Sequence, residues 1–232
     1  MKQAIVLAGG FGTRLRSVVS DVPKPMASIA GRPFLELLLG HLVSNGFERI
    51  VLSVGYLSEA IVAHFGDAFR GVPIAYAVES EPLGTGGAIR AALAHCERGH
   101  VYVLNGDTYL AVDTAATDAL WAARGLPIIV AREVDDTARY GKLEVDAAGR
   151  IRGFLEKDAS GGAGLINAGC YVLPTDIADE FPASERFSFE TEYLRDAVSR
   201  REFLALPTDA EFIDIGTPED YAREQTLLSA HG

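Results

Sequence analysis

Cysteine and histidine are scarce in this sequence, and their scarcity removes several classes of function. The two cysteines, Cys96 and Cys170, lie far apart and give neither a zinc-binding spacing nor a disulfide framework. We interpret both as buried or half-buried thiols in a reducing cytoplasm. The five histidines show no metal-ligand spacing, and no G-x-S-x-G or H-E-x-x-H motif occurs. A zinc centre and a serine-hydrolase site are therefore not expected.

Basic residues are also in short supply. Lysine and arginine total 21 against 32 aspartate and glutamate residues, which gives a formal net charge of −11. Nucleic-acid binding needs clustered basic side chains that neutralise phosphates, so we expect no nucleic-acid partner. A small phosphorylated substrate remains open, because a few well-placed cations in a cleft are enough to bind it.

No long hydrophobic run is present. The first ten residues, MKQAIVLAGG, contain an apolar stretch that is too short for a signal peptide and is interrupted by glycines. Nothing approaches the ~20 apolar residues that span a bilayer, so we expect a cytoplasmic protein without a membrane partner. With 48% hydrophobic and 23% charged residues, the composition is otherwise that of an ordinary globular protein.

The first half of the chain alternates between two kinds of segment. Apolar runs typical of strands occur at 4–8, 50–54, 73–78, 101–104 and 127–131, and helical spacing occurs at 34–45, 57–65, 86–96 and 113–124. This alternation predicts an α/β fold in which helices cover both faces of a parallel sheet. Ligands bind at the carboxyl ends of the strands in such sheets, and the unusual loops of this sequence follow strand ends.

The second half is less regular. We expect a hairpin over 140–156, a strand over 165–173, a helix over 188–200, and short strands at 203–206 and 211–215. The last helix is expected to begin at Thr217, a good N-cap that is followed by Pro218 in the first turn.

A glycine-rich segment with the sequence LAGGFGTRL follows the first predicted strand. It is not a dinucleotide fingerprint, because Leu15 stands where G-x-G-x-x-G requires a third glycine, and it is not a Walker A motif, because no Gly-Lys-Ser/Thr follows. Its glycines still allow backbone N–H groups to approach a phosphate closely, and Arg14 can add charge-assisted hydrogen bonds. Alone, the segment is compatible with a phosphate-binding loop or with a simple tight turn. Thr13 can support such a loop or cap the helix after it.

The next segment, Pro23-Lys24-Pro25, holds a lysine between two prolines. Each proline fixes its own φ and restricts the residue before it, a frame that an ordinary surface lysine does not need. Together, G-G-x-G-T-R-L and P-K-P resemble the signature of the nucleotide-sugar pyrophosphorylases, the sugar-phosphate nucleotidyltransferases. The pairing is specific, although each half alone is weak.

The resemblance extends over nearly the whole chain and implies a fold. The family has a Rossmann-like domain, so we expect a mixed, mainly parallel sheet with helices on both faces. The chain is similar to the short, single-domain form of the family. In that form, residues 1–137 would bind the nucleotide, residues 138–215 would bind the sugar phosphate, and residues 216–232 would form a C-terminal helix.

The resemblance also implies roles for individual residues. Arg14 and Lys24 are the expected catalytic residues, which bind the triphosphate and its leaving pyrophosphate. Mg²⁺ is the expected cofactor, held by Asp107 and Asp214. The expected nucleotide contacts are Leu7, Ala8, Gly9, Gly10, Gly12, Thr13, Arg14, Glu79, Glu81, Gly84, Thr85 and Gly106. The expected sugar-phosphate contacts are Tyr140, Gly141, Glu156, Lys157 and Asn167.

Four stretches, 16–26, 164–169, 188–190 and 212–216, are similar to the D-glycero-α-D-manno-heptose 1-phosphate guanylyltransferases. The resemblance thus implies transfer of GMP from GTP to the heptose 1-phosphate, which gives GDP-heptose and pyrophosphate. Mannose 1-phosphate guanylyltransferases share most of these motifs and remain an alternative. A homodimer and a role in supplying capsule polysaccharide precursors are expectations from the resemblance alone.

Guanine presents two donors on one edge, N1–H and the amino group, and a carboxylate can accept both. Glu79 and Glu81 precede the turn at Gly84, so either one is a candidate guanine acceptor. A solvated acidic loop is the competing interpretation, because exposed glutamate is common.

Three other readings stay open. One is transfer of a different nucleotide or to a different sugar phosphate. Another is a non-catalytic nucleotide-sugar sensor, which the joint presence of Arg14, Lys24, Asp107 and Asp214 disfavours. The third is an NAD-dependent oxidoreductase, which the missing third glycine disfavours.

Overall fold

Four parallel strands form the centre of the computed structural model, which describes residues 1–10, 12, 15, 19, 21–138, 140–155 and 161–229, without the side chains of 224 and 226–229. They are β1 (Gln3–Leu7), β4 (Arg49–Val54), β6 (Val72–Val78) and β7 (His100–Asn105). Their order is β7-β1-β4-β6, and the helices that connect them are α1 (Phe34–Ser44), α2 (Ser58–Phe65) and α3 (Gly84–Leu93). The chain moves outward from β1 to β6 and then returns to the other side of β1 to form β7. The strand order therefore reverses between β1 and β7, the place where ligands bind in open α/β sheets.

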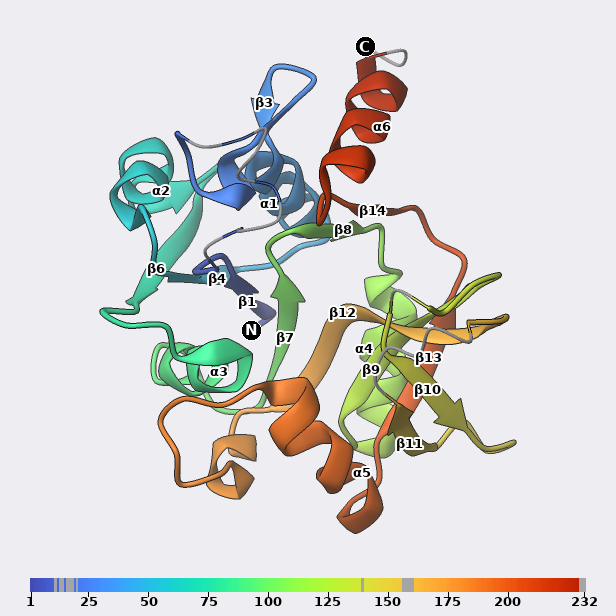
Figure 1. Ribbon diagram of the computed structural model, residues 1–232. Helices are drawn as coiled ribbons and strands as arrows, with labels where there is room; N and C mark the ends of the chain where they lie inside the picture. Colours follow the sequence, from blue (N-terminus) through green and yellow to red (C-terminus); the bar gives the residue numbers. More distant parts are fainter. Residues whose placement is uncertain are drawn as a thin grey trace.

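Antiparallel pairing extends the sheet beyond β7. The long strand β12 (Gly164–Pro174) pairs with β7 and also with β9 (Ile128–Val134) and β10 (Lys142–Val145). The remaining strands of the 10-stranded sheet are β5 (Ala68–Phe69), β11 (Ile151–Leu155) and β13 (Leu204–Thr208). The predicted mixed sheet is confirmed, with its parallel strands concentrated in the first half of the chain (Figure 1).

Short elements complete the architecture. Two ribbons pair β8 (Thr108–Leu110) with β14 (Phe212–Asp214) and β2 (Ser28–Ile29) with β3 (Arg32–Pro33). The helical segments are α4 (Thr114–Arg124), α5 (Arg195–Arg200), α6 (Pro218–Ser229), the 3₁₀ turns η1 (Lys24–Met26) and η2 (Ile177–Glu180), and the π-helix η3 (Phe189–Leu194). The helix predicted over 188–200 is thus a π-helix that continues into an α-helix, and π-helical turns often occur at functional sites.

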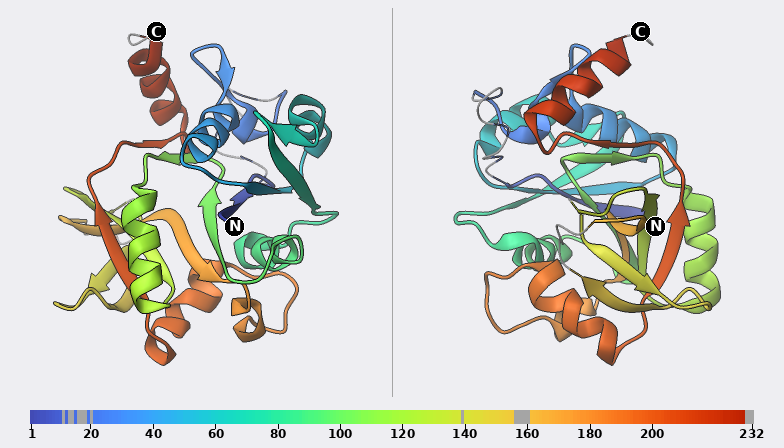
Figure 2. Two further views of the ribbon diagram at one scale, coloured as in Figure 1. Left: turned by 180° about the vertical axis from the view of Figure 1, so that it is seen from behind. Right: turned by 45° about the vertical axis from the view of Figure 1, so that its right-hand side comes forward.

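Side-chain alternation along the strands builds a core on each face of the sheet. In β1, Ile5 points to one face, where it packs in a cluster with Ile89 of α3 and Phe189 of η3. Val6 points to the other face, where the cluster includes Leu38 of α1. Consequently α3, η3 and α5 cover one face, and α1, α2 and α4 cover the other, as the views in Figure 2 show.

The two cysteines are thiols, as predicted. Cys170 on β12 is buried, and Cys96 after α3 is half-buried. Burial raises the pKa of the Cys96 thiol to about 11 and that of Cys170 to about 12, so both stay protonated and poorly reactive at neutral pH. Within the described ranges, no helix has the length and apolar character needed to cross a membrane.

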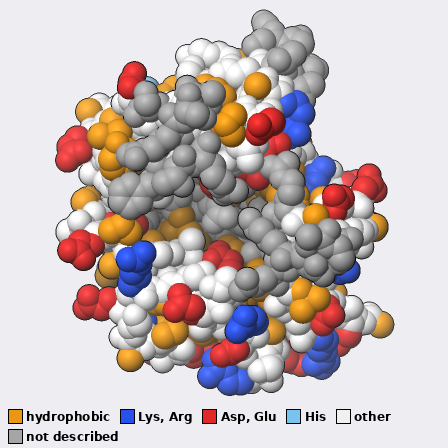
Figure 3. Space-filling view, viewed as in Figure 1, with side chains coloured by type: hydrophobic (Ala, Val, Ile, Leu, Met, Phe, Trp, Pro, Cys, Tyr) orange, Lys and Arg blue, Asp and Glu red, His pale blue; other side chains and the backbone are white. Residues whose placement is uncertain are grey.

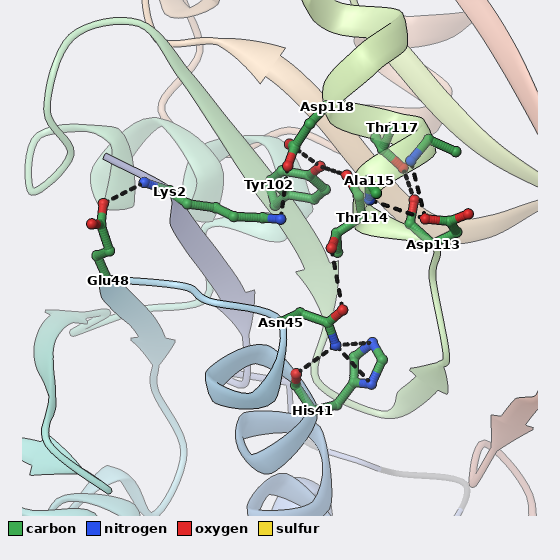
Figure 4. A network of polar contacts seen from close by, with 11 residues as sticks. Lys2, His41, Asn45, Glu48, Tyr102, Asp113, Thr114, Ala115, Thr117 and Asp118 are labelled. Atoms are coloured by element: carbon green, nitrogen blue, oxygen red, sulfur yellow. Dashed lines mark hydrogen bonds and ion pairs between the residues drawn. The ribbon is translucent and has the colours of Figure 1, made fainter.

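A polar network ties the start of the chain to the helices behind the sheet (Figure 4). Tyr102 of β7 donates from its hydroxyl to Asp118 Oδ1 of α4 at 2.6 Å, and Lys2 Nζ lies 2.8 Å from Asp118 Oδ2. Thr114 Oγ1 donates to Asn45 Oδ1 at 3.2 Å, which joins α4 to the end of α1. Burial and the hydrogen bond to Asp118 raise the pKa of Tyr102, so the phenol remains a donor.

This network predicts the effect of removing one hydroxyl. Tyr102→Phe should lower the free energy of unfolding by about 1 kcal/mol, because the half-exposed Asp118 carboxylate loses the hydrogen bond from the buried phenol. Urea denaturation of the two proteins measures this difference. Unchanged stability would mean that water replaces the phenol at Asp118.

Candidate active site

Two cavities adjoin at the carboxyl ends of β1 and β7. Their volumes are about 360 Å³ and 420 Å³, and Asn105 and Asp107 line both of them. Figure 3 shows the corresponding face of the molecule, which is hollowed near its centre, with acidic side-chain atoms visible there. The site therefore lies where the reversal of strand order predicts it.

The first cavity contains most of the residues that the sequence predicts for the nucleotide. Its described lining includes Leu7, Ala8, Gly9, Gly10, Gly12, Lys24, Glu79, Gly84 and Thr85. Gly106 is an exception, because it faces β1 instead of a cavity. Its N–H donates to the Leu7 carbonyl at 2.9 Å, and a Cβ at this position would lie 2.6 Å from the same oxygen. The Gly106 backbone thus packs β7 against β1, and its predicted nucleotide contact is not seen in the lining.

A tight backbone frame positions Lys24 in the first cavity. Pro23 precedes the turn η1, Pro25 is buried within it, and Met26 N donates to the Pro23 carbonyl at 2.7 Å. Gly12 approaches from the glycine-rich loop with φ +57°, and a Cβ there would lie 2.8 Å from Lys24 Cβ. Glycine at this position therefore allows the loop and the lysine turn to pack together.

Lys24 pairs with one of two neighbouring carboxylates. Its Nζ lies 2.6 Å from Asp107 Oδ2, and only 9% of its side chain is exposed. Asp214 lies at the end of β14, beside Thr108 of β8, and lines the second cavity. Burial raises the pKa of Asp214, and the Asp107 carboxylate raises it further, whereas Lys24 and the Gly216 N–H lower it.

Glu79 and Glu81 occupy different positions. Glu79 lies between the first cavity and a smaller hollow of about 200 Å³, and it lines both. Its carboxylate accepts hydrogen bonds from Ser53 Oγ and from Leu83 N, each at 3.0 Å. Glu81 is exposed and is found in the lining of the smaller hollow. The structure therefore distinguishes two candidates that the sequence leaves equivalent.

The second cavity contains Tyr140, Gly141 and Asn167, which the sequence predicts for the sugar phosphate. Asn167 Nδ2 donates to Tyr171 Oη at 2.6 Å, and its Oδ1 accepts from Gly169 N at 3.0 Å. Both bonds orient the Asn167 amide at the cavity wall.

Several residues of the second cavity are absent from the predicted site. They are Thr108, Phe154, Tyr171, Ser188, Glu190, Thr191 and Phe212, whereas Asn105, Ala168 and Gly169 of the same lining belong to motifs that the family resemblance covers. The segment Ser188-Phe189-Glu190 is similar to the heptose 1-phosphate guanylyltransferases, but nothing in the sequence showed that it faces a cavity. Gly169, with φ +70°, is close to Asn105, because a Cβ there would lie 2.6 Å from Asn105 Nδ2.

Four predicted residues lie outside the described part of the chain. They are Thr13 and Arg14 of the glycine-rich loop and Glu156 and Lys157 after β11. Their expected roles stay predictions.

The close approach of Gly12 to Lys24 gives a testable consequence. Gly12→Ala should weaken the affinity for a nucleoside triphosphate about tenfold, roughly 1.4 kcal/mol, because the new methyl group displaces the lysine and the positive φ is strained. Titration calorimetry measures the affinity. Gly46→Ala is the matched control, since Gly46 also has a positive φ but no atom within 4 Å of an added Cβ. Equal affinities for wild type and Gly12→Ala would show that Lys24 needs no such support.

Comparisons with known proteins show the family of this chain. A protein of Campylobacter jejuni named D-glycero-alpha-D-manno-heptose 1-phosphate guanylyltransferase is 42% identical over 94% of this chain and 96% of its own length. A protein of the same name from Aneurinibacillus thermoaerophilus is 38% identical over 97% and 98%. The crystal structure of HddC from Yersinia pseudotuberculosis has a TM-score of 0.87 and 38% identity, covering 98% of this chain and all of that one. Residues 3–230 match the nucleotidyl transferase family, and the chain belongs to it.

Proposed function

We propose that this protein transfers GMP from GTP to D-glycero-α-D-manno-heptose 1-phosphate, which gives GDP-heptose and pyrophosphate. The observation that carries the proposal is the meeting of two cavities at Asn105 and Asp107, where Lys24 of the first cavity pairs with Asp107. A nucleotidyl transfer needs two anionic substrates side by side, and each cavity has room for one of them. The choice of base and sugar is supported by two relatives named for this reaction.

The first cavity takes GTP and the second takes the sugar phosphate. An oxygen of the sugar 1-phosphate attacks the α-phosphorus, and the bond from this phosphorus to the bridging oxygen breaks. Pyrophosphate leaves with the bonding electrons. The nucleophile is already an anion, so no general base is required, and catalysis consists of positioning and electrostatic stabilisation.

Lys24 supplies positive charge at the boundary between the cavities. Its ammonium group is largely shielded from water, where an electrostatic interaction is stronger than in solution. The nearby Asp107 carboxylate holds the ammonium in place. Arg14 and Lys157 are proposed to neutralise the triphosphate and the sugar phosphate, respectively.

The residues present fit a magnesium ion. Asp107 and Asp214 are close enough for their charges to raise the pKa of Asp214, and a divalent cation would relieve that repulsion. No group of three or more potential metal-ligating side chains occurs among the residues the structure describes. Two carboxylates are enough for Mg²⁺, which usually takes one or two and completes its shell with phosphates and water. When bound, the ion would neutralise charge on the phosphates.

Polar and aromatic side chains suit the second cavity to a sugar. Asn167 and Glu190 offer hydrogen-bonding groups for hydroxyls, and the rings of Tyr140, Phe154 and Phe212 form apolar surface. Hydroxyl-specific hydrogen bonds discriminate strongly, because an unmatched buried polar group is costly. We further propose, from the family resemblance, a cytoplasmic enzyme that supplies a capsule polysaccharide precursor.

The reaction is tested by measuring pyrophosphate release from GTP, ATP, CTP, UTP and dTTP, each with the heptose 1-phosphate or with α-D-mannose 1-phosphate. Release should require GTP, the heptose phosphate and Mg²⁺, and should stop with EDTA. Equal use of mannose phosphate would make the protein a broader guanylyltransferase. No release from any pair, in folded protein, would overturn the proposal.

Base preference should depend on Glu79 more than on Glu81. Glu79 lies at the first cavity and its bonds to Ser53 and Leu83 orient it, so a guanine edge can use its remaining lone pairs. Glu79→Gln should reduce the ratio of kcat/KM for GTP over ATP by about 10- to 100-fold, which corresponds to the loss of a hydrogen bond to a charged group worth about 1.5–3 kcal/mol. Glu81→Gln is the matched control and should keep the wild-type ratio. A reduced GTP-over-ATP ratio in Glu81→Gln, with the wild-type ratio kept in Glu79→Gln, would assign the base to Glu81.

A further inference from the structure

Thr85 lies between the two cavities. Thr85 lines the first cavity, whereas its hydroxyl is hydrogen-bonded to a residue that lines the second. Thr85 Oγ1 donates to Glu190 Oε2 at 2.6 Å and accepts from Phe189 N at 2.8 Å. The one hydrogen of the hydroxyl is therefore used at Glu190, which lines the second cavity.

Three donors hold the Glu190 carboxylate. Besides Thr85, Ser188 Oγ donates to Oε2 at 3.2 Å and Tyr171 Oη donates to Oε1 at 3.1 Å. Burial and the charge of Glu190 raise the pKa of Tyr171, so its phenol stays protonated and continues to donate. A carboxylate has about four lone-pair positions. From the described residues, Oε2 accepts two bonds and Oε1 accepts one, which leaves a position on Oε1 for a ligand in the second cavity.

The turn that carries Thr85 is fixed to the segment before Glu190. Phe187 N donates to the Leu83 carbonyl and Gly86 N donates to the Phe187 carbonyl, each at 3.0 Å. A Cβ on Gly86 would lie 2.1 Å from the Phe187 ring, and one on Gly87 would lie 2.3 Å from the Glu185 carbonyl oxygen. The glycines of this turn therefore permit a close approach between backbone segments about 100 residues apart.

We propose that Thr85 is a positioning residue for the sugar, which holds Glu190 so that the free lone pair of Oε1 accepts a sugar hydroxyl. The inference rests on the proposed assignment of the second cavity to the sugar phosphate. The Thr85 hydroxyl is committed to Glu190 and Phe189, so it has no hydrogen left to donate to a nucleotide, although Thr85 still lines the first cavity as the sequence predicted. Without the hydroxyl, Glu190 loses its shortest hydrogen bond and the Phe189 N–H loses its acceptor at the start of η3.

The test compares Michaelis constants in the full-length protein. Thr85→Val removes the hydroxyl at nearly constant volume, so it should raise KM for the sugar phosphate about tenfold, equivalent to one hydrogen bond of roughly 1.4 kcal/mol. KM for GTP should stay within about twofold. Thr85→Ser keeps the hydroxyl and should restore the wild-type constants. An increase in KM for GTP alone would make Thr85 a nucleotide contact and overturn the proposal.

Two controls separate positioning from general destabilisation. Thr117→Val removes another buried hydroxyl, one that donates to the Asp113 carbonyl at 2.7 Å within α4. It should lower the melting temperature without changing either KM. If Thr85 acts through Glu190, adding Thr85→Val to Glu190→Gln should raise KM for the sugar phosphate no further. Additive effects would show that Thr85 acts independently of Glu190.

Failure of the proposed function would be seen in the wild-type protein, as a lack of pyrophosphate release from GTP and the heptose 1-phosphate. If the wild type uses another sugar phosphate, the variants are compared on that substrate. The positioning role then requires a raised KM for that sugar phosphate and an unchanged KM for GTP in Thr85→Val. Unchanged constants in Thr85→Val, with the wild type active, would overturn the inference and leave the proposed reaction intact.

Discussion

The shielded ion pair of Lys24 with Asp107 is the interaction around which the rest of the site is arranged. Two strand ends, β1 and β7, bring the glycine-rich loop and Asp107 together, and the lysine enters between them. A largely buried ammonium group needs a partner, because desolvation of an isolated charge is costly. The partner is also where the two cavities meet, so the charge that stabilises the fold locally lies where phosphates are proposed to react.

Close backbone approach is the second constraint on the site, and it explains more of the glycines than phosphate binding does. Gly12 accommodates Lys24, Gly106 packs on β1, and Gly86 packs on Phe187. Gly9 is similar, because a Cβ there would lie 2.5 Å from Glu79 Oε1. These glycines determine how near the loops come to one another, and this spacing defines the cavities.

The sequence predicted the features that depend on local pattern. Apolar periodicity located most strands and helices, and the family resemblance assigned Lys24 and Asp107 to one site, where the structure pairs them. The sequence did not predict η3, since periodicity does not separate a π-helix from an α-helix, nor the short strand β8, which is only three residues long. It also did not distinguish Glu79 from Glu81, because that difference depends on which carboxylate lies near Ser53 and Leu83 in space.

The hydrogen bonds of Thr85 depend on the fold in the same way. The sequence placed this threonine at the nucleotide because it stands in a glycine-rich turn after a strand, and it does line the first cavity. Its hydroxyl partner is Glu190, 105 residues away, and no local pattern encodes such a bond.

The hydrogen bond between Thr85 and Glu190 links the two halves of the sheet, each of which carries most of one cavity. The parallel half carries the cavity proposed for the nucleotide, and the antiparallel half carries most of the cavity proposed for the sugar. The carboxylate that faces the sugar is nevertheless held by a residue of the nucleotide half. Because the turn at Thr85 is fixed to Phe187 through backbone hydrogen bonds, a shift of that turn must move Glu190 as well. On the proposed assignment of the second cavity, the orientation of the carboxylate offered to the sugar therefore depends on the position of a turn in the nucleotide half.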